Sequence, residues 1–252
     1  MGRLAGKVAI ISGGATGMGG AASSLFAAEG AKVAIIDRNL QAAEERAHLI
    51  TQAGGQAVAF AADVSKADEV EAAVAAATRA QGAANVLFNH AGTIVIKPFL
   101  DTTEEEWDWL HAVNVKSMFL MTRAVLPGMI AQGGGGVIIN MASIGAIKPI
   151  ASTSVYWAIK AALISMTKSL AVEWSAYRIR SVAIAPGLVR TDMGSPHIDK
   201  LEELGIRRTL LGTFSNAEDV ANLALFLASP AGRSANASTF VLDEGTLAMS
   251  AA

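Results

Sequence analysis

The sequence predicts an α/β protein in which helices cover both faces of a parallel, doubly wound sheet of about seven strands. Short β-branched apolar segments alternate with longer alanine-rich segments along the whole chain. The apolar segments do not alternate with polar residues, which is typical of strands buried on both faces. Strand–helix alternation with right-handed crossovers then gives a parallel sheet. Because α/β folds often reach about 250 residues as one unit, we expect residues 1–252 to form a single domain.

The predicted strands cover residues 8–11, 33–36, 57–61, 86–88, 137–139, 182–185 and 239–242. The predicted helices lie between them, near residues 17–29, 39–53, 66–81, 103–131, 155–176 and 216–228. Two helices begin with the pattern of a capping box, Thr103 with Glu106 and Ser215 with Glu218. Ligands of such sheets bind at the carboxyl ends of the strands, and every polar motif described below lies just after a predicted strand or in the helix that follows.

The composition excludes several classes of protein. Hydrophobic residues make up 52% of the chain and charged residues 17%, which excludes a disordered chain. The 20 Lys and Arg against 22 Asp and Glu give a net charge of −2 without basic blocks, so nucleic acid is not an expected partner. The absence of cysteine excludes disulfides and fits a reducing cytoplasm. The 4 histidines lack the spacing of metal ligands, so we expect no metal.

The mean hydropathy of +0.40 raises the question of a membrane span. The longest uncharged segment, residues 124–147, is long enough to cross a bilayer. However, Pro127 and the glycines at 133–136 would leave backbone groups unsatisfied in lipid. The apolar segment 8–11 is too short for the core of a signal peptide. We therefore expect no membrane partner and a cytoplasmic location.

A glycine-rich segment with the spacing G-x3-G-x-G follows the first strand and opens the first helix. Glycines there permit a tight turn and a close approach of the backbone to a pyrophosphate, while the helix N-terminus supplies free N–H groups. The alternative is an ordinary glycine-rich turn, but the position after the first strand favours a dinucleotide site. The candidate cofactor-binding residues of this loop are Ser12, Gly13, Thr16, Gly17, Met18 and Gly19.

Acidic residues follow the second and third strands. Asp37 is placed where a carboxylate accepts hydrogen bonds from the adenosine ribose hydroxyls and repels the 2′-phosphate of NADP. Arg38 favours NADP instead, since an arginine pairs with that phosphate, and Asp37 also suits a helix cap. We expect NAD, with NADP as the alternative. Asp63 and Val64 are candidates for the border of the adenine, although Asp63 also suits a loop or cap.

The fourth strand ends in Asn89-His90-Ala91-Gly92. We expect the backbone of this turn and the Asn89 side chain to hold the strand end beside the cofactor, so Asn89, Ala91 and Gly92 are candidate cofactor-binding residues. His90 is a candidate general base, but a lone histidine in a turn is more often a hydrogen-bonded structural residue. We therefore assign His90 no catalytic role.

Tyr156 and Lys160 share one face of a predicted helix, because positions i and i+4 lie side by side. A tyrosine hydroxyl with a pKa of about 10 is a poor base at neutral pH, and we expect the nearby ammonium to lower that pKa. Ser143, after the fifth strand, is expected to orient a carbonyl or alcohol oxygen. Together these residues suit proton transfer for an alcohol/ketone pair beside a hydride carrier. The alternative is an amphipathic helix with incidental polar residues.

The ordered set of motifs resembles the short-chain dehydrogenase/reductase superfamily, in its subgroup of short single-domain oxidoreductases. The resemblance extends from Leu4 to about Gly245 and implies a Rossmann-type fold. It rests on the glycine loop at 13–19, Asp63, Asn89-x-Ala91-Gly92, Asn114, Ser143, Tyr156-x3-Lys160 and Pro186-Gly187.

The resemblance implies catalytic roles for four residues. Tyr156 would be the acid/base, Ser143 would orient the substrate oxygen, and Lys160 would lower the Tyr156 pKa and bind the nicotinamide ribose. Asn114 would hold a water in a proton relay from Lys160; the alternative is a polar residue satisfied within its own helix. The resemblance also implies a homo-oligomer assembled through the helices near 103–131 and 155–176, for which we expect a tetramer, with a dimer as the alternative.

The resemblance further implies contacts with the cofactor. Pro186 and Gly187 would pass near the nicotinamide, and Val189 and Thr191 would bind its carboxamide. Thr16 occupies a position where NADP-preferring members often carry a basic residue, which favours NAD.

The chain departs from the family pattern at three positions. Ser12 replaces the usual threonine and keeps the hydroxyl, whereas His90 stands where asparagine is common and puts the hydrogen bonding of that turn in doubt. Glu244 stands where glycine is more usual, which we expect to alter the C-terminal packing between subunits.

The substrate is expected to be a neutral, apolar or aromatic secondary alcohol or ketone of moderate size. Segment 192–208 is expected to form a lid over the pocket, with Gly194, Pro196 and Gly205 as hinges. Residues expected to line the substrate pocket are Ser143, Ile94, Ile144, Ile150, Trp157, Leu188 and Met193, although core or interface packing is the alternative for at least half of them.

The leading hypothesis is therefore an NAD(H)-dependent alcohol dehydrogenase or ketone reductase. An NADPH-dependent carbonyl reductase or 3-oxoacyl-thioester reductase is the nearest alternative, supported by Arg38. The alternative from another class is a catalytically idle dinucleotide-binding sensor or scaffold, which would not require Asn114, Ser143, Tyr156 and Lys160 together.

Overall fold

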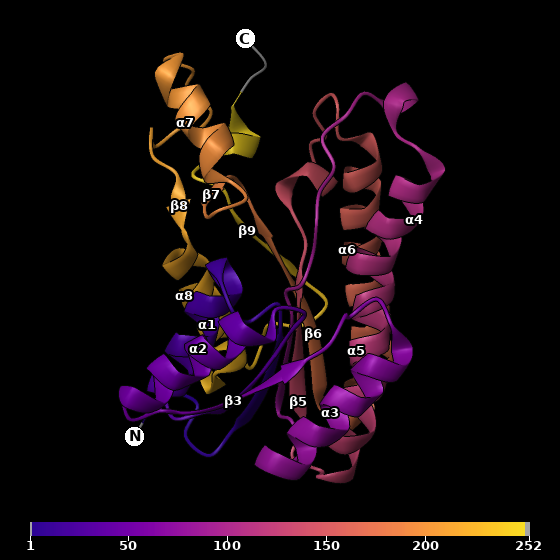
Figure 1. Ribbon diagram of the computed structural model, residues 1–252, viewed down its shortest axis with the longest axis vertical. Helices are drawn as coiled ribbons and strands as arrows, with labels where there is room; N and C mark the ends of the chain where they lie inside the picture. The colour runs from indigo at the N-terminus through magenta and orange to yellow at the C-terminus, as the bar shows by residue number, and fades with distance from the viewer. Residues whose placement is uncertain (1, 250–252) are drawn as a thin grey trace.

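The computed structural model describes residues 2–249 (Figure 1). Seven parallel strands form one sheet in the order β3-β2-β1-β4-β5-β6-β9. They are β1 (Val8–Ser12), β2 (Lys32–Asp37), β3 (Gln56–Ala61), β4 (Val86–Asn89), β5 (Gly136–Met141), β6 (Ile179–Pro186) and β9 (Thr239–Leu242). The winding direction changes between β1 and β4, which is the doubly wound Rossmann-type arrangement that the sequence predicts. All seven predicted strands are present.

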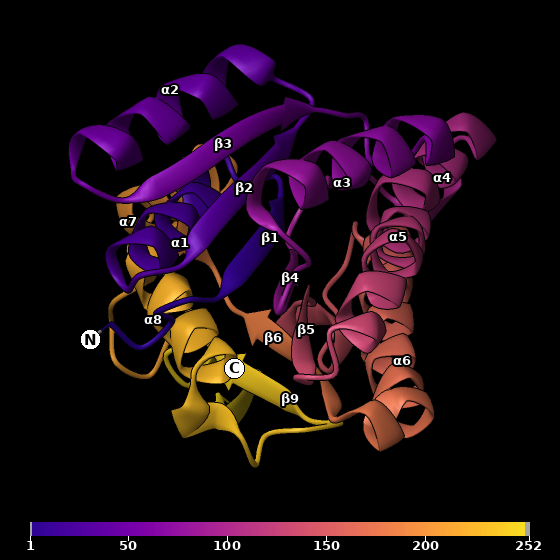
Figure 2. The same cartoon turned by 90° about the horizontal axis from the view of Figure 1, so that it is seen from below.

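Helices cover both faces of this sheet (Figure 2). On one face lie α1 (Gly17–Ala28), α2 (Leu40–Gln52) and α8 (Ala217–Ala228), and on the other α3 (Ala67–Gln81), α5 (Ser117–Ala131) and α6 (Ser154–Trp174). Phe26, Ile50 and Leu225 are buried on the first face. Val74, Met121 and Met129 are buried on the second. Single 3-10 turns occur at Phe99–Asp101, Ile144–Ala146, Ser175–Tyr177, Pro230–Gly232 and Thr246–Ala248.

The helix predicted at 103–131 is interrupted. It consists of α4 (Glu104–His111), a π-helical turn (Ala112–Lys116) and α5. The expected capping box is confirmed, since the backbone N–H of Glu106 donates to Thr103 Oγ1 at 3.3 Å and that of Thr103 donates to Glu106 Oε2 at 3.1 Å. No residue pattern marks the π turn, because it depends on what the helix packs against.

The second predicted capping box is wrong by one residue. The backbone N–H of Asn216 donates to Asp219 Oδ2 at 2.7 Å, so the box at the start of α8 is formed by Asn216 and Asp219. Ser215 precedes this box, and its hydroxyl donates to Glu244 instead.

A small second sheet, which the sequence does not predict, pairs β7 (Val189–Arg190) with β8 (Ser215–Asn216) in parallel. The chain between these two strands contains α7 (Ser195–Glu203). The pairing brings together both ends of the segment that includes the expected lid, residues 192–208.

The uncharged segment 124–147 is not one helix, because it contains the end of α5, a glycine turn and β5. Among residues 2–249, one helix, Ser154–Tyr177, is long and apolar enough to cross a membrane by length and composition alone. This helix is α6 with the turn that follows it. It packs beside β5 and β6 and carries Lys160, which is buried at 3% exposure.

Candidate active site

The carboxyl ends of β1, β2, β4 and β5 lie level with one another. Ser12 is in register with Ile36 and with Asn89, and Asn89 is in register with Asn140. Ser12 Oγ accepts hydrogen bonds from the backbone N–H groups of His90 at 3.2 Å and Ala91 at 3.3 Å. Ser12, which replaces the usual threonine, therefore connects the turn after β4 to the end of β1 through its hydroxyl.

The glycine loop is compact enough to exclude side chains at its centre. A Cβ at Gly19 would lie 2.1 Å from the carbonyl oxygen of Gly13 and 2.6 Å from His90 Nδ1. Gly13 has a φ of +65°, a conformation that favours glycine. The Thr16 side chain does not cap α1, and the first turn carries no acidic residue. The loop and this helix N-terminus therefore fit a pyrophosphate, because the backbone N–H groups and the helix dipole favour an anion there.

Asp37 holds the glycine loop and does not cap α2. Its Oδ2 accepts from the backbone N–H of Ala15 at 3.3 Å, and its Oδ1 accepts from that of Asn39 at 3.0 Å. The cap of α2 is Asn39, whose side chain accepts from the backbone N–H of Ala42 at 3.1 Å. The alternative that Asp37 is a helix cap is therefore excluded.

Asp63 combines a loop role with a place in the cavity wall. Its Oδ1 accepts from the Ser65 hydroxyl at 2.7 Å and from the Ser65 backbone N–H at 3.0 Å. The Ser65 hydroxyl bond is the main reason why the pKa of Asp63 is lowered. Both Asp63 and Val64 line the cavity described below.

Asn89 lies behind the site. Its Nδ2 donates to Asn140 Oδ1 at 2.9 Å and to Thr122 Oγ1 at 3.2 Å, while Asn140 Nδ2 donates to Thr167 Oγ1 at 3.0 Å. These buried groups connect β4 and β5 with α5 and α6. Asn89 thus fixes the strand end from within the core, whereas Ala91 and Gly92 reach the cavity.

Asn114 occupies the π-helical turn and is 2% exposed. Its Nδ2 donates to the carbonyl oxygens of Leu110 at 2.9 Å and Thr93 at 3.0 Å, and its Oδ1 accepts from the Thr93 backbone N–H at 3.3 Å. A Cβ at Gly92 would lie 2.8 Å from Asn114 Oδ1 and 3.5 Å from Lys160 Nζ. Asn114 therefore joins the turn after β4 to the helix beside Lys160. The relay water stays a prediction.

Tyr156 and Lys160 lie side by side near the start of α6, as the spacing predicts. Lys160 Nζ is 5.4 Å from the centre of the Tyr156 ring and donates to the carbonyl oxygen of Met141 at 2.9 Å. Burial lowers the pKa of Lys160 to about 8. Burial also raises the pKa of Tyr156, contrary to the sequence-based expectation, because the phenolate loses its hydration in the packed site.

Ser143 is the N-terminal residue of the turn that follows β5. Its Oγ accepts from the backbone N–H of Gly145 at 3.3 Å, which leaves the hydroxyl hydrogen free to donate to another oxygen. Gly145 is required at this turn, since a Cβ there would lie 2.0 Å from the Trp157 ring. The Trp157 Nε1–H donates to the carbonyl oxygen of Ile150 at 3.1 Å.

One cavity of about 370 Å³ brings most of the predicted residues together. It runs from the glycine loop and the ends of β2 and β3 to Tyr156 and Lys160. The residues that were predicted for the site and that line this cavity are Gly13, Thr16, Gly17, Met18, Asp37, Arg38, Asp63, Val64, Ala91, Gly92, Tyr156, Lys160, Thr191 and Met193. This geometry fits a dinucleotide whose pyrophosphate lies on α1 and whose reactive end lies beside Tyr156.

Comparisons with known proteins agree with this geometry. The family model described as "Enoyl-(Acyl carrier protein) reductase" matches residues 13–246. The chain belongs to the short-chain dehydrogenase/reductase superfamily. Enzymes of this superfamily use nicotinamide cofactors.

Three relatives illustrate the position of this short-chain dehydrogenase/reductase in its superfamily. It is 35% identical to the D-threitol dehydrogenase of Mycolicibacterium smegmatis, over 96% of this chain and 94% of the relative. It is 36% identical to the sorbitol dehydrogenase of Cereibacter sphaeroides, over 96% and 98%. The crystal structure of a short-chain type dehydrogenase/reductase from Mycobacterium marinum superposes with a TM-score of 0.91, at 32% identity and 96% coverage of both chains.

Several residues predicted for the site of this dehydrogenase/reductase lie outside the cavity wall. Val189 is 5% exposed and packs in the core, and the Gly187 backbone N–H donates to the carbonyl oxygen of Leu242 at 2.8 Å. Of the apolar residues expected around the substrate, Met193 lines the cavity. The predicted residues outside the wall are Ser12, Gly19, Asn89, Ile94, Asn114, Ser143, Ile144, Ile150, Trp157, Pro186, Gly187, Leu188 and Val189.

Sequence reasoning missed part of the wall. Trp109 and Val113 come from α4 and the π-helical turn, and no local pattern distinguishes them from core or surface residues. Asp192 follows Thr191, a residue predicted to bind the cofactor, and this adjacency was the available indication that Asp192 lines the cavity. The missed lining residues are Ile36, Ala62, Thr93, Trp109, Val113 and Met141; His90, considered only as a general base, and Asp192, expected only as part of the lid, also line the cavity.

His90 is half-buried between the glycine loop and Lys160 and lines the cavity. Its Nδ1 lies 3.1 Å from the carbonyl oxygen of Gly13, and its ring packs on Phe88 at 5.6 Å between centroids. Burial, with the neighbouring Lys160 cation as the second cause, lowers the pKa of His90 to about 4. His90 is therefore neutral at physiological pH, in accord with a structural role.

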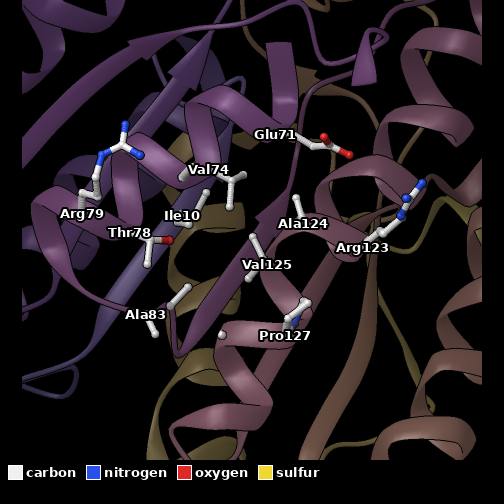
Figure 3. A pocket seen from close by; sticks show the side chains of 13 residues that line it. Ile10, Glu71, Val74, Thr78, Arg79, Ala83, Arg123, Ala124, Val125 and Pro127 are labelled. Carbon is white, nitrogen blue, oxygen red and sulfur yellow. The ribbon is translucent and has the colours of Figure 1, made fainter. Parts of the chain in front are cut away.

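A second cavity, of about 520 Å³, lies between α3 and α5, near the residues that precede β4. Figure 3 shows its apolar wall, with Val74 and Val125 facing each other and Arg79 and Arg123 on opposite sides. No residue predicted for the active site lines it. Among residues 2–249, no cluster of His, Asp and Glu is arranged to hold a metal ion.

Proposed function

We propose that this protein is an NAD(H)-dependent alcohol dehydrogenase or ketone reductase with Tyr156 as its acid/base. The observation that carries the proposal is that Tyr156 and Lys160 line the same cavity as the glycine loop and Asp37. The names of the relatives, D-threitol and sorbitol dehydrogenases, support a substrate with a CH–OH group.

The bound nicotinamide supplies the acceptor or donor of the hydride. In the oxidation of an alcohol, Tyr156 in its phenolate form would accept the proton of the substrate hydroxyl at Oη. In reduction, Tyr156 returns that proton to the carbonyl oxygen. Burial raises the pKa of Tyr156, which suits the acid role. The Lys160 ammonium, 5.4 Å from the ring, stabilises the phenolate that oxidation requires.

Ser143 and Asn114 support this proton transfer. The Ser143 hydroxyl, whose oxygen already accepts from Gly145, donates to the substrate oxygen and orients it. Asn114 holds the backbone at Thr93, so that Gly92 stays beside Lys160. Both residues act best when they are held rigidly before the substrate binds, which their own hydrogen bonds ensure.

NAD is the proposed cofactor because the Asp37 carboxylate lies in the cavity wall beyond the glycine loop. A negative charge there accepts hydrogen bonds from ribose hydroxyls and repels a 2′-phosphate. Arg38 lines the same cavity and supports the alternative, an NADPH-dependent carbonyl or 3-oxoacyl-thioester reductase.

The proposed substrate is a secondary alcohol or its ketone. The cavity that Tyr156 lines is apolar at Met193 and Met141, which favours a neutral substrate. Segment 192–208 is proposed to be the lid, because Asp192 and Met193 begin it within the cavity wall.

The test is a turnover screen that follows NADH or NADPH absorbance. The purified protein is offered NAD or NADP with secondary alcohols and polyols, and the reduced cofactors with ketones and a 3-oxoacyl thioester. We expect turnover with NAD and an alcohol, and its loss in Tyr156→Phe with NADH binding retained. Turnover confined to NADPH and the thioester would replace the proposal with its alternative.

The alternative from another class of protein is a dinucleotide-binding sensor without catalytic activity. It predicts tight NADH binding, no turnover with any pair and no functional change in Tyr156→Phe. The buried Lys160 beside the half-buried Tyr156 argues against it, since binding alone does not require a desolvated lysine with a lowered pKa.

We also propose a cytoplasmic homotetramer. Apolar side chains are exposed on the outer helices, with Trp107 at 42% and Phe119 at 49% on α4 and α5 and Val172 at 77% on α6. A second copy of the chain would cover these surfaces. Light scattering after size-exclusion chromatography tests this, and Val172→Glu should shift the mass toward smaller species.

A further inference from the structure

Glu244, two residues after the end of β9, has a left-handed backbone conformation with a φ of +52°. Residues other than glycine, asparagine and aspartate are uncommon there, because the Cβ crowds the backbone. Glycine is the more usual residue at this position in the family pattern. A glutamate that accepts the conformation therefore needs interactions that hold it.

The Glu244 side chain supplies one of these interactions. Ser215, which is 1% exposed, donates from its hydroxyl to Glu244 Oε1 at 2.5 Å. A hydrogen bond from a hydroxyl to a carboxylate is stronger than one between neutral groups. Both partners belong to the same chain, so the substitution of glycine by Glu244 serves a contact within the subunit.

The Glu244 backbone supplies the other interaction. Its carbonyl oxygen accepts from the backbone N–H groups of Leu210 at 2.9 Å and Leu211 at 3.3 Å. Two neighbouring residues reinforce this contact. The Thr246 hydroxyl donates to the carbonyl oxygen of Arg208 at 3.0 Å, and Gly245 packs against Leu210 so closely that a Cβ there would lie 2.8 Å from the leucine side chain.

These contacts reach one half of the segment between β7 and β8. The outgoing half leaves the cavity wall at Met193 and forms α7, which is fixed separately by ion pairs of Arg190 with Asp199 and Glu202. The returning half, residues 204–214, leads to Ser215, the first residue of β8. Figure 1 shows α7 and α4 at the same end of the molecule, beyond the carboxyl ends of the strands.

We propose that Glu244 is a positioning residue for the substrate, which holds the segment that leads from the lid (192–208) back to β8. Its carboxylate, bound to Ser215, locks residue 244 in the conformation in which its carbonyl accepts from Leu210 and Leu211. A glycine would reach the same conformation but would not be locked in it. The catalytic effect of this contact rests on the proposed function, whereas the contact itself does not.

Hydrogen exchange of the backbone tests the contact without any assay of activity. In Glu244→Gly, we expect the amides of Leu210 and Leu211 to exchange about tenfold faster, because one charge-assisted hydrogen bond is lost. Ser215→Ala should produce the same change, and the double variant should be no worse than either single variant, since all three remove one interaction. Glu244→Gln keeps an oxygen acceptor and should restore most of the protection.

Steady-state kinetics then tests positioning. In Glu244→Gly and Ser215→Ala, we expect substrate KM to rise about threefold to tenfold, while kcat changes less than about twofold. Glu218→Gln removes an exposed carboxylate three residues after Ser215 and should leave KM unchanged. A merely structural role would lower kcat and Tm together in both variants.

Unchanged exchange at Leu210 and Leu211 in Glu244→Gly would overturn the proposal, as would an unchanged KM with faster exchange. If no substrate is turned over at all, the proposed function fails, but the exchange experiment still decides whether Glu244 holds this segment.

Discussion

Lys160 Nζ donates a 2.9 Å hydrogen bond to the carbonyl oxygen of Met141 while it lies 5.4 Å from the centre of the Tyr156 ring. The contact anchors the ammonium at the end of β5 and keeps it on the same side of α6 as the tyrosine. The site therefore contains a buried cation whose position is set by the sheet and whose nearest ionisable neighbour on the helix is the proposed acid/base.

Removal of this cation is expected to lower kcat by about 10² to 10⁴, the usual range for the loss of acid–base assistance. Lys160→Met has a similar shape but no charge to stabilise the Tyr156 phenolate. Lys168→Met, on the exposed side of the same helix, is the matched control and should keep full activity. A Lys160→Met enzyme with normal kcat and a normal thermal melt would contradict the proposed role.

Charge at position 37 is expected to decide the choice of cofactor. Asp37→Asn keeps one oxygen, which can accept from either the Ala15 or the Asn39 N–H group, and it removes the repulsion of a 2′-phosphate. We expect kcat/KM with NADP to rise about tenfold and that with NAD to fall. Asp37→Ala should show the same shift with weaker binding of both cofactors, because the loop contact is also lost. Equal kcat/KM values for NAD in wild type and both variants would refute the assignment.

Trp109 is expected to report cofactor binding by energy transfer to NADH. It lines the cavity together with Val113, and aromatic rings stack readily on bases. Trp109→Phe should lose most of the NADH emission excited through tryptophan. Trp107, two positions earlier and equally exposed at 42% against 43%, stacks on His111 instead, so Trp107→Phe should keep that emission. Equal losses in both variants would argue against a specific place for Trp109.

His90 is expected to make the protein less stable in mild acid. Burial lowers its pKa to about 4 in the folded state, against 6.5 for an unperturbed histidine. Between these values the unfolded chain binds more protons than the folded one, so the free energy of unfolding falls as the pH falls. The whole window corresponds to about 3 kcal/mol.

His90→Asn cannot titrate in that window and serves as the reference. Urea unfolding at pH 7 and pH 5 should show that wild type loses about 2 kcal/mol more than the variant. Carboxylates contribute equally to both proteins and cancel in the comparison. If both lose the same amount, the His90 ring titrates normally and is not held neutral by burial.

The sequence predicted the sheet and the main chemical groups because these depend on near neighbours in the chain. Buried strands are continuous apolar segments, and a pair such as Tyr156 and Lys160 meets through helical spacing alone. The glycine loop was equally predictable from the sequence, since its backbone conformations depend on residue type. The direction of the Tyr156 pKa shift was not predictable from the sequence, because it depends on how much water the packed cavity excludes.

The amino-acid sequence by itself determined the order of strands and helices, the polar residues at the strand ends and the pairing of Tyr156 with Lys160. The tertiary structure alone placed Trp109 in the cavity wall, turned the helix at Asn114 into a π turn and brought Ser215 to Glu244 across 29 residues. The physical reason is that these features arise from contacts between segments distant in the chain, whose burial and hydrogen bonding no local pattern specifies.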